Sequence, residues 1–180
     1  VAVAADSLGV TAESFCYMPG YGIGSAATTL VGQSMGAERR DQARRFAWLS
    51  VALGVGVMTC TGILMYIAAP WIFSMLTPDA GVRTLGAQVL RIEAFAEPLF
   101  AASIVAAGAL RGAGDTLVPS VMELGSMWGV RITLALLLVG PLGLHGVWIA
   151  MCVELCVRGL LFLLRMLRGR WLEMRAVCAE

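Results

Sequence analysis

Long apolar runs separated by short polar turns form the dominant pattern of this chain. No charged residue occurs from Ser14 to Ala37 or from Phe46 to Pro78. A bilayer core is about 30 Å thick, and a helix needs about 20 apolar residues to cross it. Both runs are long enough. Hydrocarbon offers the backbone no hydrogen-bond partner, and the runs lack the alternating polarity of barrel strands, so helices are expected.

The pattern predicts five membrane-spanning helices with short connections. Asp79 and Asp115 precede the third and fourth of them and suit helix N-caps. We therefore expect an all-α, polytopic membrane bundle. The predicted spans cover about residues 13–33, 45–70, 83–110, 117–139 and 145–164.

Composition and charge support this class of protein. The chain is 59% hydrophobic and 14% charged, whereas soluble domains average roughly 25% charged residues. A net charge of +1 gives no reason to expect a nucleic-acid partner. Arginine is enriched in cytoplasmic loops, which predicts a cytoplasmic C-terminus. On this topology one side holds Arg39, Arg40, Arg44, Arg45, Arg111, Arg165, Arg168, Arg170 and Arg175.

Four charged residues inside the predicted spans are interpreted as structural. A charge within the bilayer costs about 2.5–3.5 kcal/mol in insertion assays, so it is kept when paired or when it lines a wet cavity. Glu154 precedes Arg158 by four residues, the favourable order for a helical ion pair. Glu123 and Arg131 lie two turns apart, and each can instead meet a neighbouring helix.

Glu93 and Glu97 form a different kind of pair. They share one face of the third predicted helix, and no cation lies three or four residues from Glu97. Two close carboxylates in a poorly solvated place cannot both ionise cheaply, which is what a site for a coupling cation requires. The alternative places Glu93 at the membrane interface and pairs Glu97 with Arg131. Glu13 is expected to be half solvated.

Prolines and glycines predict where helices bend and pack. Pro19, followed by Gly20, and Pro98 lie near the middle of predicted spans and should kink them. Broken helices at mid-membrane mark transporter binding sites, although a static kink is equally consistent. Glycines four residues apart allow close helix packing. These pairs are Gly20/Gly24, Gly32/Gly36, Gly108/Gly112 and Gly125/Gly129.

Residues suited to catalysis are scarce. The chain has one histidine, His145, at a predicted helix end. Cys152 and Cys156 are one helical turn apart, but no second cysteine or histidine pair completes a zinc site. We therefore expect no enzyme activity, no metal site and no organic cofactor.

Three motifs in register carry a resemblance to the multidrug and toxic compound extrusion (MATE) family. The segment ESFCYMPGYGIGSAATTLVGQSMGA (13–37) resembles the eighth MATE helix. AGALRGAGDT (107–116) resembles the turn between the tenth and eleventh, and LGLHGVWIA (142–150) the start of the twelfth. The resemblance implies helices eight to twelve of a twelve-helix, two-lobe fold. Residues 1–180 would be the C-terminal lobe without its first helix.

The resemblance also implies a function for the whole transporter. MATE proteins export cationic, amphipathic drugs or metabolites in exchange for H⁺ or Na⁺ by alternating access. That implies a bacterial inner-membrane protein whose partners are the bilayer, the substrates and the missing N-terminal lobe. Some branches carry an aspartate about one turn after Glu97, where this chain reads Leu99, Phe100 and Ala101. We predict that Glu97 takes the role of that aspartate in this chain.

Two alternatives stay open at this stage. A related flippase for lipid-linked precursors would need cavity cations to meet a phosphate, and only Arg131 and Arg158 lie within the predicted spans. The second alternative is a membrane fragment without transport activity, because five helices cannot form a two-lobe cavity by themselves.

Overall fold

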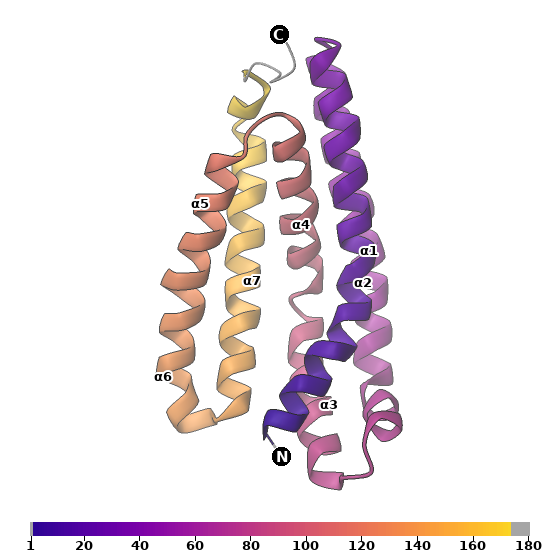
Figure 1. The fold of residues 1–180 in the computed structure, drawn as a ribbon, viewed down its shortest axis with the longest axis vertical. Helices are drawn as coiled ribbons and strands as arrows, with labels where there is room; N and C mark the ends of the chain where they lie inside the picture. The colour runs from indigo at the N-terminus through magenta and orange to yellow at the C-terminus, as the bar shows by residue number, and fades with distance from the viewer. Residues whose placement is uncertain (1, 174–180) are drawn as a thin grey trace.

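The computed structural model describes residues 2–173, which fold into an elongated bundle of helices with no β-strand in that range (Figure 1). The predicted all-α class is confirmed. The helices are α1 (Ala2–Gly36), α2 (Arg40–Leu76), α3 (Ala80–Ala94), α4 (Glu97–Gly112), α5 (Leu117–Ser126), the π-helix η1 (Met127–Ile132), α6 (Thr133–Leu142), α7 (Leu144–Leu167) and the 3₁₀ turn η2 (Arg170–Glu173).

The predicted count of five long helices is wrong by one. The third predicted helix is divided into α3 and α4 by a two-residue turn at Phe95 and Ala96. Pro98, in the first turn of α4, has no N–H to give to the carbonyl of Ala94, so the helical ladder is interrupted there. α5, η1 and α6 follow one another without a turn and form a single long stretch.

Three helical stretches in the described range are long and apolar enough to cross a membrane, judged by length and composition alone. They are α2, the stretch from Leu117 to Leu142, and α7. α3 and α4 have 15 and 16 residues, so neither reaches the required length alone. α1 has 35 residues, but glycine, serine and threonine dilute its apolar character.

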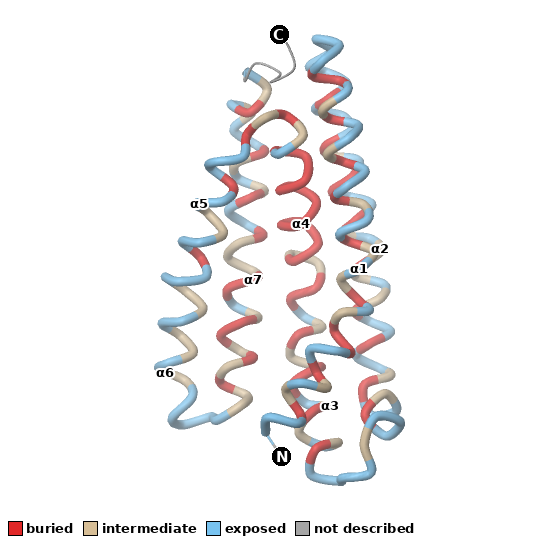
Figure 2. The backbone as a smooth tube through the Cα atoms, viewed as in Figure 1, coloured by how far each residue is buried: buried red, intermediate tan, exposed pale blue. Residues whose placement is uncertain are grey.

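α4 occupies the centre of the bundle and is its most buried helix. Figure 2 shows it almost continuously buried over its second half, and every residue from Phe100 to Leu110 is buried. It contacts α1, α2 and α7. By contrast, most of the stretch from Leu117 to Leu142 is exposed and apolar (Figure 2). An exposed apolar helix suits contact with lipid or another apolar surface.

The arginine-rich connections lie at one end of the bundle. Figure 1 shows the α1–α2 connection, the α4–α5 connection and the C-terminal end of α7 together at the top. One hydrophobic cluster joins these ends, including Met35, Ala43, Leu110 and Trp171. The α2–α3 and α6–α7 connections lie at the opposite end. This alternation matches the one expected from charge, and the orientation in the membrane stays a prediction.

Glycines bring α1 and α4 into backbone contact. A Cβ atom on Gly108 would meet the carbonyl of Gly24, and one on Gly112 would meet the carbonyl of Thr28. The Thr28 hydroxyl also donates a hydrogen bond of 2.9 Å to the carbonyl of Gly108. Close approach through small residues is the expected packing mode of membrane helices. Gly125 and Gly129 have open space around them instead, so within residues 2–173 this pair does not make the predicted packing contact.

Candidate functional site

Glu93 and Glu97 are both buried. One lies at the end of α3 and the other at the start of α4, on the two sides of the helix break. Glu93 is 0% and Glu97 1% exposed. None of their four carboxylate oxygens has a hydrogen-bond partner within residues 2–173. A buried charge without a partner is costly, because the lost hydration is not replaced. Such a pair can be relieved by a bound proton or cation.

The break between α3 and α4 sets the positions of the two carboxylates. Short-range bonds replace the helical ladder there, with Phe95 N–H donating to the Ile92 carbonyl at 3.3 Å and Ala96 N–H to the Glu93 carbonyl at 2.8 Å. Glu93 thus lies near the end of α3, and Glu97 begins α4. Non-helical backbone inside a membrane bundle is tolerated where protein covers it or where it lines a cavity.

Gly62 of α2 makes room for Glu97. A Cβ atom at this glycine would lie 3.1 Å from both Cβ and Cγ of Glu97. Beside this contact, a groove of about 300 Å³ runs between α2 and the break. Its lining includes Gly62, Tyr66, Phe95 and Pro98. Pro98 therefore both interrupts the helix and lines a groove, as the prediction of a kink or cavity residue allows.

Glu13 is the third member of this acidic cluster. The expectation that it is half solvated is wrong, because α1 packs against α3 and leaves Glu13 only 7% exposed. It lies within electrostatic range of both Glu93 and Glu97. The cluster thus draws one carboxylate from each of α1, α3 and α4. Sequence reasoning missed it because Glu13 lies 80 residues before Glu93 in the chain.

Arg131 is a cation within electrostatic range of Glu13 and Glu93. It lies in the π-helix η1 and donates from Nη2 to the thioether sulfur of Met151 at 2.8 Å. Thioethers are weak acceptors. Among the described residues no ion pair joins Arg131 to Glu97, so the alternative pairing considered from the sequence is absent.

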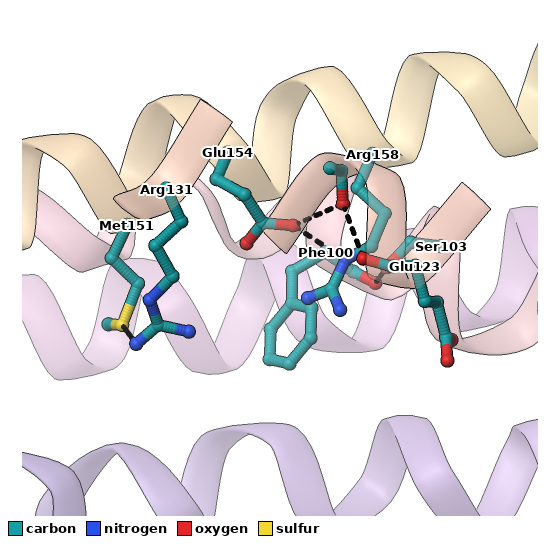
Figure 3. A network of polar contacts seen from close by, with 8 residues as sticks. Phe100, Ser103, Glu123, Arg131, Met151, Glu154 and Arg158 are labelled. Carbon is teal, nitrogen blue, oxygen red and sulfur yellow. Dashed lines mark hydrogen bonds and ion pairs between the residues drawn. The ribbon is translucent and has the colours of Figure 1, made fainter. Parts of the chain in front are cut away.

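A separate polar network surrounds Glu154 (Figure 3). Glu154, 1% exposed, accepts a hydrogen bond of 2.7 Å from the Ser126 hydroxyl. It also faces Arg158 Nε at 3.4 Å, one helical turn away. The structure therefore brings this predicted pair together. The Arg158 guanidinium carbon also lies over the Phe100 ring, 5.6 Å from the ring centre. The Glu123 side chain points away from the Glu154–Arg158 pair (Figure 3).

The remaining predicted bend residues belong to α1. The helix continues through Pro19, and its N-terminal part leans at an angle to the rest of the helix (Figure 1). Gly20 faces α2, where an added Cβ would collide with the sulfur of Met58. Gly20 is therefore a packing residue in the described bundle.

The prediction that Asp115 caps the following helix is wrong. Instead of capping α5, it accepts two hydrogen bonds from Arg165, at 3.0 Å from Nε and 2.8 Å from Nη2. Thr116 occupies the N-cap position and forms no side-chain cap. Asp79, by contrast, caps α3 as predicted and accepts from Val82 N–H at 2.9 Å.

Comparison with known proteins decides the family. The family model described as MatE matches residues 1–137. The chain belongs to the MATE family. This MATE chain is 32% identical over 181 residues to a probable multidrug resistance protein NorM from Thermotoga maritima, covering 98% of the chain and 38% of the relative. It is 28% identical over 173 residues to the multidrug resistance protein PmpM from Pseudomonas aeruginosa, covering 93% of the chain and 36% of PmpM.

Solved MATE transporters share the fold. The chain matches the MATE transporter ClbM in complex with Rb⁺ with a TM-score of 0.86 at 24% identity, covering 96% of this chain and 41% of ClbM. It matches the Vibrio cholerae MATE transporter VcmN in the bent form with the same TM-score at 17% identity, covering 96% of this chain and 39% of VcmN. The MATE chain thus spans about two fifths of the length of the proteins it matches.

Proposed function

We propose that this chain is the C-terminal part of a cation-coupled antiporter that exports cationic, amphipathic drugs or metabolites. The observation that carries the proposal is the pair of buried, unpartnered carboxylates, Glu93 and Glu97, at a helix break. The relatives named multidrug resistance proteins support export of small organic substrates. The bundle would lie in the inner membrane and face an N-terminal lobe across a central cavity.

The acidic cluster supplies the coupling chemistry in this proposal. Binding of H⁺ or Na⁺ at Glu97, assisted by Glu93, removes negative charge that the protein leaves unbalanced. Because the ion binds one access state better than the other, it shifts the population between them. The break beside Pro98 supplies backbone that can change conformation without breaking a continuous helix.

The charge inside the bundle favours cationic cargo over lipid-linked phosphates. Arg158 is already paired with Glu154, and Arg131 lies within electrostatic range of the acidic cluster. No further arginine lies within the long helical stretches apart from their ends. Three buried carboxylates, by contrast, offer a negative field that attracts organic cations.

Neutralising the cluster tests the proposal. In a transporter with both lobes, E97Q should lower cation-driven efflux of ethidium by at least about tenfold, and E93Q should lower it less. Glutamine keeps the side-chain volume but holds no exchangeable charge. E173Q, at an exposed position of η2, is the matched control. Efflux is measured in everted vesicles and normalised to the amount of transporter.

Full ethidium efflux by E97Q and by the E93Q/E97Q double variant would remove the cluster from the mechanism. Flipping of a fluorescent lipid by reconstituted protein, with no ethidium efflux, would favour the flippase alternative. Cation-driven efflux by residues 1–180 reconstituted alone would contradict the need for a second lobe.

A further inference from the structure

The first turns of α2 carry a cluster of uncompensated positive charge. Arg39, Arg40, Arg44 and Arg45 are all exposed. The two ion pairs found within residues 2–173 involve other residues, and the acids beside the four arginines are Glu38 and Asp41, both exposed. The segment therefore keeps a net positive charge that no ion pair in the described structure neutralises.

Two of these arginines line a groove together with two apolar side chains. Arg44, Arg45, Trp48 and Leu49 line a shallow groove of about 480 Å³ on the surface of α2. Residues three and four apart are neighbours on a helix face, so Trp48 lies one turn along from both arginines and Leu49 one turn along from Arg45. Trp48 packs against the hydrophobic cluster at this end of the bundle, which holds its ring in place.

The surface changes from charged to apolar along the helix. Beyond the groove, the exposed side chains of α2 are apolar for several turns, with Leu49 65% and Leu53 59% exposed.

We propose that this groove, defined by Arg44, Arg45, Trp48 and Leu49, binds the headgroup of an anionic phospholipid. The two guanidinium groups hold the phosphodiester, the Trp48 indole lies at the level of the glycerol backbone, and an acyl chain follows Leu49 and Leu53 along α2. The site is independent of the acidic cluster and of the transport proposal.

Charge and apolarity together select this ligand. A free phosphate or a nucleic acid would use the arginines but would leave Leu49 and Leu53 exposed to water. A neutral phospholipid would cover the apolar surface but would leave two guanidinium groups without an anion. Only an anionic amphiphile satisfies both parts of the groove. Basic residues beside a membrane helix and aromatic residues at the interface are the common elements of such sites.

Native mass spectrometry of a detergent-solubilised transporter with both lobes tests the site. Phosphatidylglycerol is titrated against phosphatidylethanolamine, and bound lipids are counted. R44Q/R45Q should weaken phosphatidylglycerol binding at one site by tenfold or more, with phosphatidylethanolamine unchanged. R168Q/R170Q is the matched control, because it removes the same charge from exposed positions at the same end of the bundle. R44K/R45K should keep most of the binding.

Each outcome decides for or against the groove. Loss in R44Q/R45Q alone, with an unaltered size-exclusion profile, supports it. Equal losses in R44Q/R45Q and R168Q/R170Q would mean that lipid responds to diffuse positive charge, and no loss in either would mean that the groove is empty. Both results overturn the proposal. Competition by glycerol phosphate as strong as that by the intact lipid would also overturn it, since the acyl chain would then contribute nothing.

Discussion

Individual buried acids in this bundle differ in how far their charge is compensated. Asp115 is paired directly with Arg165. Glu154 shares a serine hydroxyl and Arg158. Glu97 has no partner among the described residues. Removing one member of a buried pair leaves its partner without compensation and should destabilise the fold. A buried carboxylate without any partner is instead a candidate for function.

The Asp115–Arg165 pair should hold the α4–α5 turn against α7. Asp115 is 1% exposed and Arg165 16%, so D115A leaves a partly buried guanidinium without its acceptor. The expected loss is about 2 kcal/mol, between the values for surface and buried pairs. That corresponds to a melting temperature lower by roughly 5 °C, measured by fluorescence-detected size exclusion after heating.

Two variants check the origin of that loss. D41A removes an exposed acid that forms no ion pair in the described range and should leave the melting temperature unchanged. D115L/R165M removes both charges and should recover much of the stability. If the double variant is less stable than D115A, the pair is not the cause.

At the scale of elements, α1 and α4 depend on glycine faces. Gly24, Gly108 and Gly112 let the two backbones touch, and Thr28 adds a hydrogen bond across the contact. Dispersion grows as the helices approach, and any added side chain separates them. The same spacing at Gly125 and Gly129 has no such role, because those glycines face open space.

Substituting these glycines should separate the two cases. In G108A the new methyl group meets the carbonyl of Gly24, and overpacking of this kind costs about 1–3 kcal/mol. G125A adds a methyl group into open space on α5 and should be neutral or slightly stabilising. The recovery of monodisperse protein after heating measures both. Equal recovery of the two variants would contradict the predicted contact.

At the scale of the molecule, positive charge is concentrated at one end of the bundle. The arginine-rich connections share one end (Figure 1). Basic loops face the cytoplasm in membrane proteins. That end also holds the proposed lipid groove, whereas the acidic cluster lies beside the break within the bundle. The arrangement separates a surface for anionic lipid from an interior for cations.

Labelling should reveal the orientation. In a cysteine-free background, R39C and R168C should react with a membrane-impermeant maleimide only from the cytoplasmic side. P78C, in the α2–α3 connection at the opposite end, should react only from outside. Reaction of R39C and R168C from opposite sides would refute the topology.

The sequence by itself determined the features that depend on neighbours along the chain. Apolar runs predicted helices, Pro98 predicted the interruption beside Glu97, and four-residue spacing predicted the Glu154–Arg158 pair. The tertiary structure decided the contacts between distant segments. It brought Glu13 to Glu93 and gave Asp115 a partner 50 residues away. Such contacts depend on how each helix is rotated and which neighbour it meets, and local pattern does not encode either.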